Sequence, residues 1–358
     1  GAGTGLVGGA LGSGLVVDFA RYNSRISDFD RDLQTVQVGA GVVLDRLNDE
    51  LAPHGMWFGP DVATSSRATL GGMIANNSSG AHAPVYGTTG DHLAALEIVM
   101  VDGTVTVIGN GDGLPEIRDV VDEIVVEHAA EIADRLPDGL VKRWPGFGLD
   151  RALRSPGDLT QVVAGSEGTL AGITSAIVRV VPKPQRRYLG ILFFQSVMEA
   201  LQSTVDLADL GAAAIEHLDR AALDQTSGKR SFAAARDLLR LDEAPCEALL
   251  LVEFFDDDAG LVELEKRGLG VRRRLCRDPA EQELAWGLRR AGLSLLTSRA
   301  GAAKPWGFIE DVCVLPERLP EYAAGLSEIF EPLGLEASFY GHAASGELHV
   351  RPVLDLHT

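Results

Sequence analysis

Three glycine-rich clusters constrain most strongly what this chain can fold into. They read GAGTGLVGGALGSG over residues 1–14, GPDVATSSRATLGGMIANNSSGAHAPVYGTTGDH over residues 59–92 and GSEGTLAGIT over residues 165–174. Small residues let the main chain approach a ligand closely, and consecutive backbone N–H groups can enclose a pyrophosphate. Each cluster alone is also typical of an ordinary turn. The three together, placed between strand-like segments, favour a ligand held by main-chain groups.

The first cluster contains a literal G-x-G-x-x-G pattern at residues 3–8, which is the fingerprint of a Rossmann dinucleotide site. In that fold the third glycine opens a helix. Here Gly9, Gly12 and Gly14 would break a helix, and Leu15–Phe19 has the composition of a strand. We therefore interpret the segment as a pyrophosphate-binding loop and not as a Rossmann unit.

The first half of the chain predicts mostly strands, because apolar residues alternate with a period of two. Strands are expected at Leu15–Phe19, Thr35–Val38, Leu96–Val101, Thr104–Ile108 and Ile173–Val181, and amphipathic helices at Val42–His54 and Val120–Leu136. Asp102-Gly103 between two apolar runs indicates a hairpin. The tract from residue 59 to residue 90 has too little periodicity to predict either element.

Pro182-Lys183-Pro184 marks a change of pattern, so we expect two domains, residues 1–184 and 185–358. The second predicts an α+β sheet layer with helices on one face. Its expected strands are Leu189–Phe194, Ala214–Leu218, Leu249–Phe255 and Phe308–Val314, and its expected helices are Val197–Leu210, Pro279–Leu296 and Pro320–Phe330.

Composition excludes several function classes. A formal net charge of −19 over 358 residues disfavours nucleic acid as a partner. Cys246, Cys276 and Cys313 lie far apart without a C-x-x-C pair, so neither a disulfide framework nor a cysteine-held iron–sulfur cluster is expected. Without a transmembrane stretch or a signal sequence, a cytoplasmic location is expected. Because the chain starts at Gly1, inside a glycine-rich loop, we expect a fragment.

In this order and spacing the three clusters resemble the FAD-binding domain of the vanillyl alcohol oxidase and p-cresol methylhydroxylase (PCMH) superfamily. The branch resembled is that of D-lactate dehydrogenases, the glycolate oxidase flavin subunit and D-2-hydroxyglutarate dehydrogenases. The implied fold class is α+β, with a PCMH-type FAD-binding domain followed by an α+β cap domain with an antiparallel sheet. The resemblance covers essentially the whole chain.

The resemblance also implies which residues contact FAD. The pyrophosphate would be wrapped by Ala2, Gly3, Thr4, Gly5 and Leu6, the flavin and pyrophosphate lined by Thr69, Gly71, Gly72, Asn77, Ser79 and Gly80, and the adenosine half contacted by Glu167 and Ile173. The chain has Ser78-Ser79-Gly80 where the family often has Ala-Gly-Gly. We expect a dissociable FAD, with His82 and His92 left open as attachment points.

The second domain resembles the substrate-binding cap of these enzymes. Arg289 and Lys304 match the spacing of a basic pair that holds the substrate carboxylate, which suits an Arg fork and a Lys point charge. Without the resemblance, Arg289 beside Arg290 would be interpreted as a solvated surface charge. Glu310 and Asp311 resemble acidic residues that face the active site, or they cap a strand edge.

His342 and His349, seven residues apart around a small-residue turn, can bind a divalent metal such as Zn or polarise a hydroxyl. A lone histidine is more often structural. The family pattern H-x-G-x-G-N-x-H supplies two metal ligands there, and a later Glu-His-Gly motif supplies the third ligand and the base. This chain carries GHAASGELHV and no Glu-His-Gly, so the resemblance places the third ligand outside the chain.

The resemblance implies an FAD-dependent dehydrogenase that oxidises a D-2-hydroxy acid of the D-lactate, glycolate or D-2-hydroxyglutarate class, with hydride passing to flavin N5. Electrons would leave to a non-NAD acceptor, namely an iron–sulfur domain, a quinone or a flavoprotein. Any iron–sulfur cluster or peripheral membrane contact would belong to parts beyond this chain. The alternatives are a flavin oxidase acting on an alcohol or sugar, and a flavin-binding module without turnover.

Overall fold

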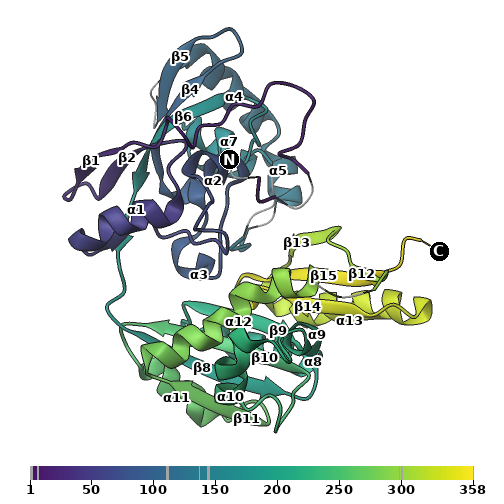
Figure 1. Ribbon diagram of the computed structural model, residues 1–358. Coiled ribbons are helices and arrows are strands. Elements are labelled where there is room, and N and C mark those ends of the chain that lie inside the picture. Colours follow the sequence, from purple (N-terminus) through teal and green to yellow (C-terminus); the bar gives the residue numbers. More distant parts are fainter. Residues whose placement is uncertain are drawn as a thin grey trace. The chain divides into compact units, whose positions relative to one another are not determined.

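The computed structural model describes residues 3–5, 8–109, 113–136, 138–142, 146–297, 299 and 301–357, and these form two compact units (Figure 1). The first unit comprises Gly1–His82, Tyr86–Gly139 and Arg143–Lys183. The second unit comprises Ala83–Val85, Leu140–Lys142 and Pro184–Thr358. Within the described part of the chain, no helix has both the length and the apolar character needed to cross a membrane.

The first unit is built on a five-stranded antiparallel sheet with the strand order β1-β2-β6-β4-β5. The strands are β1 (Ile26–Asp30), β2 (Thr35–Gly39), β6 (Gly172–Arg179), β4 (Leu93–Val99) and β5 (Val105–Gly109). The expected hairpin joins β4 to β5, where Gly103 has φ +87° and Asp102 accepts from the Thr104 N–H. The strands expected there from residue 35 onward are therefore confirmed.

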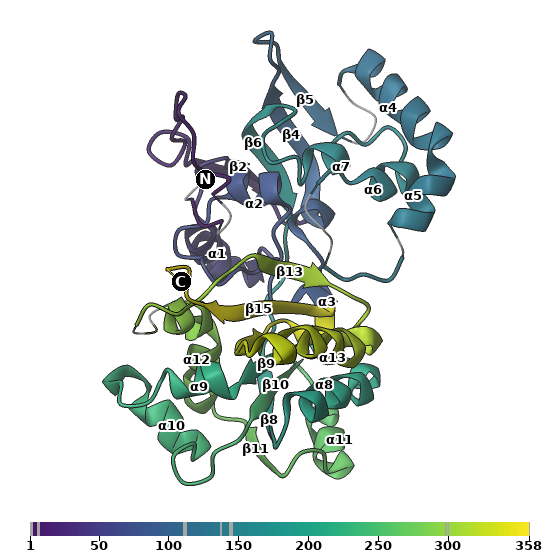
Figure 2. The same cartoon turned by 90° about the vertical axis from the view of Figure 1, so that its right-hand side faces the viewer.

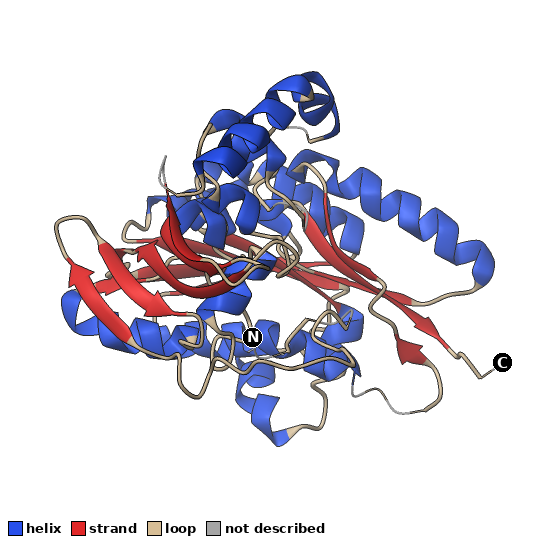
Figure 3. Ribbon diagram, turned by 90° about the horizontal axis from the view of Figure 1, so that it is seen from above, coloured by secondary structure: helices blue, strands red, loops and turns tan. Residues whose placement is uncertain are grey.

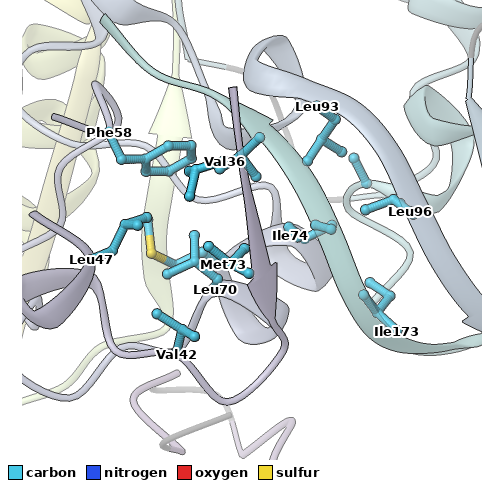
Figure 4. Packing of buried hydrophobic residues seen from close by; sticks show 14 of the residues in the cluster. Val36, Val42, Leu47, Phe58, Leu70, Met73, Ile74, Leu93, Leu96 and Ile173 are labelled. Atoms are coloured by element: carbon cyan, nitrogen blue, oxygen red, sulfur yellow. The ribbon is translucent and has the colours of Figure 1, made fainter. Parts of the chain in front are cut away.

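Helices α1 (Leu44–Leu51) and α2 (Leu70–Asn76) supply much of the core of the first unit. In α1, the buried residues Leu44, Leu47 and Leu51 recur at three- and four-residue spacing and so share one helix face. In Figure 4, Met73 and Ile74 of α2 lie among the side chains of the sheet. This apolar layer holds α2 in place.

The remaining elements of the first unit are short or peripheral. They are η1 (Ala52–His54), β3 (Met56–Trp57) paired with β7 (Val181–Pro182), η2 (Thr89–His92), α4 (Pro115–Glu127), α5 (Ala129–Arg135), α6 (Leu149–Arg154) and α7 (Thr160–Val163). The single helix expected at Val120–Leu136 is two helices, because the chain breaks at His128.

Two further expectations for the first unit are wrong. Leu15–Phe19 forms no strand, and the chain near the N-terminus is drawn as loop in Figure 3. Leu15 is 93% exposed, so the alternating pattern there has no sheet to join. The tract over residues 59–90 contains α2, and α3 (Ala83–Tyr86) follows in the segment grouped mainly with the second unit.

The second unit contains a four-stranded antiparallel sheet with the order β11-β8-β10-β9. Its strands are β11 (Arg272–Cys276), β8 (Arg187–Phe194), β10 (Ala248–Phe255) and β9 (Ala214–Asp219), and its helices are α8 (Val197–Asp206), η3 (Ala208–Leu210), α9 (Arg220–Asp224), η4 (Arg230–Phe232), α10 (Ala233–Leu239), α11 (Ala259–Arg267) and α12 (Pro279–Thr297). Helices cover both faces of this sheet, with α8 and α11 on one side and α10 and α12 on the other (Figure 2). The expectation of helices on one face is therefore wrong.

A second small sheet completes the unit and carries the histidine motif. It contains β12 (Lys304–Pro305), β15 (Glu347–Leu354), β13 (Ile309–Cys313) and β14 (Ala337–Tyr340), flanked by η5 (Pro316–Arg318), α13 (Leu319–Phe330), η6 (Glu331–Leu333) and η7 (Ala343–Ser345). A backbone bridge between His217 and Gly341 joins β9 to the turn after β14. That bridge brings the larger sheet beside the turn between the two motif histidines.

Candidate functional site

The second glycine cluster of the first unit surrounds the start of α2. Thr69 caps the helix with a side-chain oxygen 3.4 Å from the Gly72 nitrogen. The Gly71 N–H donates to the Ala40 carbonyl at 2.9 Å, and a Cβ on Gly71 would lie 2.7 Å from that of Ala40. A side chain larger than glycine would therefore push the start of α2 away from the turn after β2.

The second and third clusters meet at the other end of α2. Asn77 ends the helix in the left-handed region, and its Oδ1 accepts from the Gly90 N–H at 2.8 Å. The Gly165 N–H donates to the Ile74 carbonyl at 3.0 Å. Asn76 Nδ2 donates to Glu167 Oε1 at 2.8 Å. The structure therefore brings together two of the three segments expected to bind FAD.

Several expected cofactor residues have internal structural roles. A Cβ on Gly80 would lie 1.9 Å from the Asp61 carbonyl oxygen, so glycine is required for the contact of these two segments. Ile173 is buried in the core of the first unit, so only its main chain could reach a cofactor (Figure 4). Gly72 and Ser79 are half-buried, and Glu167 is exposed with φ +53°.

The first cluster is less defined. Gly3, Thr4 and Gly5 are exposed, whereas Ala2 and Leu6 lie outside the described residues. Among the residues that the structure describes, no hydrogen bond joins positions 3–5 to the other two clusters.

The two histidines considered for covalent flavin attachment both have internal contacts. His92 Nε2 lies 2.8 Å from the Tyr86 carbonyl oxygen, and its Nδ1 lies 3.2 Å from the Arg179 carbonyl oxygen. His82 Nδ1 lies 3.0 Å from Asp61 Oδ2. Each imidazole therefore has a polar partner within the first unit, and a dissociable FAD stays a prediction.

Ser166 is a residue that the motif did not single out. It lies in the third cluster with 3% exposure, and within the described chain its hydroxyl has no hydrogen-bond partner. A buried polar atom without a partner is costly and is commonly satisfied by a ligand or water. The clusters consist largely of glycine and other small residues. Together with the Ser166 hydroxyl, they suit the first unit to hold a nucleotide cofactor.

In the second unit, Arg289 of α12 and His342 meet at Glu216 of β9. Arg289 Nε lies 2.5 Å from Glu216 Oε2, and His342 Nδ1 lies 2.8 Å from Glu216 Oε1. Arg289 Nη2 is 3.5 Å from His342 Nδ1. Arg289 is 7% exposed, so the interpretation as a solvated surface charge is wrong.

His349, near the start of β15, lies against the imidazole of His342. The two rings are 5.5 Å apart between centroids, and the Tyr340 ring is 4.9 Å from that of His349. His349 Nδ1 lies 2.9 Å from Asp311 Oδ1, and its Nε2 lies 3.7 Å from Glu347 Oε1. We call Glu216, Arg289, Asp311, His342, Glu347 and His349, with Lys142, the imidazole cluster.

Lys142 and Glu347 complete the cluster, and the sequence did not indicate either. The Lys142 ammonium forms an ion pair with Glu347 Oε2, and the two side chains are 11% and 1% exposed. Glu347 occupies the position of the asparagine in the resembled pattern. Only its ion pair with the buried Lys142 distinguishes Glu347 from an ordinary glutamate at the start of a strand.

Burial and charge together set the protonation of the cluster. Burial lowers the pKa of His342 well below its ordinary value, and the charges of Lys142 and Arg289 lower it further. Burial raises the pKa of Asp311, but the hydrogen bond and charge of His349 outweigh it and bring that pKa below the usual range. His342 is therefore a neutral imidazole, and Asp311 is a carboxylate.

The donor set fits a divalent cation. Ligand atoms of His342, Glu347 and His349 lie within 4.8 Å of one another. Each histidine has its Nδ1 beside a carboxylate, which leaves Nε2 as the ligand atom, as in many metal sites.

Lys304 does not join the cluster. Its Nζ donates to the Arg299 carbonyl oxygen at 2.5 Å, and among the described residues no hydrogen bond or ion pair links it to the carboxylates of the imidazole cluster. The side chain of Glu310 lies outside the described part of the structure, so the expectation for Glu310 is left without a structural account.

Comparison with known proteins agrees with both halves of the chain. Residues 1–109 match the family model of an FAD binding domain, and residues 183–358 match that of the C-terminal domain of FAD linked oxidases. The D-2-hydroxyglutarate dehydrogenase of Escherichia coli (strain K12) is 32% identical over 388 residues, which cover 99% of this chain and 38% of that protein.

Two further matches are more distant. The D-lactate dehydrogenase of Archaeoglobus fulgidus is 26% identical over 99% of this chain and 69% of its own length. A crystal structure of p-cresol methylhydroxylase with substrate bound superimposes with a TM-score of 0.59 at 14% identity, covering 94% of this chain and 65% of that one. At this identity the superposition shows the fold alone.

Proposed function

The chain belongs to the FAD-linked oxidoreductases of the PCMH type, in the branch of D-2-hydroxyglutarate dehydrogenase, D-lactate dehydrogenase and glycolate oxidase, and on this premise we propose that it oxidises a small D-2-hydroxy acid. The expected fold class, a PCMH-type FAD-binding domain followed by an α+β cap domain with antiparallel sheets, is confirmed. The chain spans 38% of the length of the D-2-hydroxyglutarate dehydrogenases that it matches, so the activity of the whole protein is part of the proposal.

The observation that carries the proposal is the buried pairing of Arg289 with Glu216 beside two imidazoles. A guanidinium with 7% exposure is costly to bury, and Glu216 Oε2 lies 2.5 Å from its Nε. Its Nη groups can bind a substrate carboxylate bidentately. Lys304 would add a second positive charge, as its spacing from Arg289 predicts.

His342 and His349 would act on the substrate hydroxyl. In this proposal their Nε2 atoms hold a divalent cation such as Zn, with Glu347 as a third ligand, and the cation lowers the pKa of the hydroxyl. The combination would orient the carboxylate and hydroxyl of one 2-hydroxy acid together, which is the contribution that a protein makes to hydride transfer.

FAD would accept the carbon-bound hydrogen as hydride when bound. For its binding we propose the small-residue positions that the sequence predicts, which are Ala2, Gly3, Thr4, Gly5, Leu6, Thr69, Gly71, Gly72, Asn77, Ser79, Gly80, Glu167 and Ile173. Electrons would pass to an iron–sulfur domain, a quinone or a flavoprotein.

Anaerobic titration of the FAD-reconstituted full-length protein with D-lactate, glycolate and D-2-hydroxyglutarate tests the proposal. Bleaching of the visible flavin band by one of them would support it and identify the substrate class. If FAD binds and no acid bleaches it, the assignment to 2-hydroxy acids fails. Rapid reoxidation in air would favour an oxidase instead.

A further inference from the structure

We infer that Glu216 is a positioning residue that aligns the carboxylate-binding Arg289 with the imidazole of His342. The inference rests on the proposed function and adds to it a residue outside the recognised motifs. Glu216 lies on β9, whereas its two partners come from α12 and from the turn after β14. One side chain therefore connects three segments that are distant in sequence.

Both oxygens of Glu216 are engaged, and neither faces solvent. Its side chain is 1% exposed, Oε2 lies 2.5 Å from Arg289 Nε, and Oε1 lies 2.8 Å from His342 Nδ1. The residue lies on β9, an edge strand of its sheet, in register with Leu251 of β10, so its Cα position is fixed by main-chain hydrogen bonds. A carboxylate held this rigidly can fix the geometry of both partners.

For Arg289 the consequence is orientation. Nε lies 2.5 Å from Glu216 Oε2, Nη2 lies 3.5 Å from His342 Nδ1, and the guanidinium carbon lies 5.4 Å from the centre of the Tyr340 ring. The planar group is thereby held from one edge and beside one aromatic ring. A bidentate contact depends on such an orientation, because both N–H donors must point the same way.

For His342 the consequence is the choice of tautomer. Two groups approach Nδ1: the Glu216 carboxylate at 2.8 Å, which only accepts, and the Arg289 guanidinium at 3.5 Å, which only donates. The shorter, charge-assisted contact dominates, so Nδ1 carries the proton. Nε2 is then left as a lone pair, the form needed to bind a cation or accept a proton.

Glu253 offers a matched control for the burial of a glutamate. It lies on the neighbouring strand β10, is 0% exposed like Glu216, and accepts from the Trp286 indole N–H at 2.8 Å. Glu253→Gln therefore reports the general cost of changing a buried carboxylate in this sheet at a residue outside the imidazole cluster.

The kinetic test compares Glu216→Gln with Glu253→Gln in the full-length protein, using the acid that bleaches the wild-type flavin. We expect Glu216→Gln to raise KM and to lower kcat, with a combined loss of about 100-fold in kcat/KM, the upper range for residues that orient a ligand-binding histidine. Glu253→Gln should stay within about threefold of wild type. Equal effects of the two variants would overturn the inference.

A spectroscopic test does not depend on turnover. Nitrogen-15 NMR of the histidine side chains, with the His342 signal assigned by its loss in His342→Gln, should show Nδ1 protonated and Nε2 unprotonated in the wild-type protein. Glu216→Gln should shift His342 towards the Nε2-protonated tautomer, and Glu253→Gln should not. A wild-type His342 protonated at Nε2 would overturn the inference even if Glu216→Gln fails to fold.

The two proposals fail separately. If no acid bleaches the flavin but His342 has the expected tautomer, the proposed substrate class is wrong and the role of Glu216 in positioning His342 stands. If the flavin is bleached but His342 has the other tautomer, the proposed substrate class stands and the role of Glu216 is wrong.

Discussion

The two units use polar residues in opposite ways. In the first unit, the residues of the glycine clusters contact main chain: Asn77 binds the Gly90 N–H, and Gly80 lies against the Asp61 carbonyl. In the second unit, ionised side chains bind each other, as Glu216 binds Arg289. The first arrangement is sensitive to the volume of a residue and the second to its charge, so substitutions should affect the two units differently.

The largest effect is expected from removing a charge in the second unit. Arg289→Ala leaves Glu216 buried without its guanidinium partner, which should cost about 3–5 kcal/mol of unfolding free energy and raise KM steeply. Arg290→Ala changes the next residue, whose side chain is 46% exposed, and should cost less than about 0.5 kcal/mol. Urea unfolding and flavin reduction of both variants give the comparison, and similar losses would contradict it.

Adding volume in the first unit should have the next largest effect. Gly80→Ala places a Cβ 1.9 Å from the Asp61 carbonyl oxygen, so the main chain must shift, at a cost of about 1–3 kcal/mol. Gly12→Ala is the control, because a Cβ there meets nothing within 4 Å. Thermal unfolding distinguishes them, and an unchanged melting temperature for Gly80→Ala would show that the two segments are not in close contact.

A pH effect is expected from His217 in the second unit, because burial lowers its pKa to about 4. As the pH falls from about 6.5 to 4, the unfolded chain binds a proton that the folded chain does not. Stability present above pH 6.5 is therefore lost over that range, by up to about 3 kcal/mol. His217→Leu should lack this loss.

Denaturant unfolding at pH 7 and pH 4.5 measures the difference between wild type and His217→Leu. The comparison of the two proteins is needed because Asp219 also titrates in this range. Burial raises the pKa of Asp219 to about 6, so its contribution to stability is lost as the pH rises, opposite to that of His217. A difference that does not change with pH would exclude His217 as the titrating group.

The smallest effect is expected from a glycine substitution that raises the unfolding free energy instead of lowering it. Gly287 lies inside α12, and a Cβ there meets nothing within 4 Å. Gly287→Ala should therefore raise the unfolding free energy by up to about 1 kcal/mol through helix propensity. A decrease measured by urea unfolding would indicate a contact at that position.

The sequence predicted the fold best where local patterns decide. Pro279–Leu296 was expected as a helix and is observed as Pro279–Thr297, because a proline opens a long periodic segment. Helix α2 was missed, because Gly71 and Gly72 have poor helix propensity and contacts at both helix ends hold it in place. Leu15–Phe19 failed for the converse reason: it has strand propensity and no partner strand.

The candidate site shows the same division. The spacing of His342 and His349 predicted that the two rings would meet, and they do. Glu216 was missed, because it lies 126 residues from His342, and no local pattern marks a buried glutamate in an apolar strand as their common partner. Lys142 is more distant still from Glu347 in the sequence, and nothing in its neighbourhood indicates an ion pair.

The imidazole cluster also has an electrostatic balance of its own. Among its described members, Glu216, Asp311 and Glu347 carry three negative charges, and Arg289 and Lys142 carry two positive charges, while burial keeps His342 neutral. Before His349 is counted, these side chains have an excess of one negative charge. An anionic substrate alone would enlarge that excess, whereas a divalent cation would reverse its sign. Substrate and cation should therefore each strengthen the binding of the other, a thermodynamic coupling that follows from the net charge of the cluster.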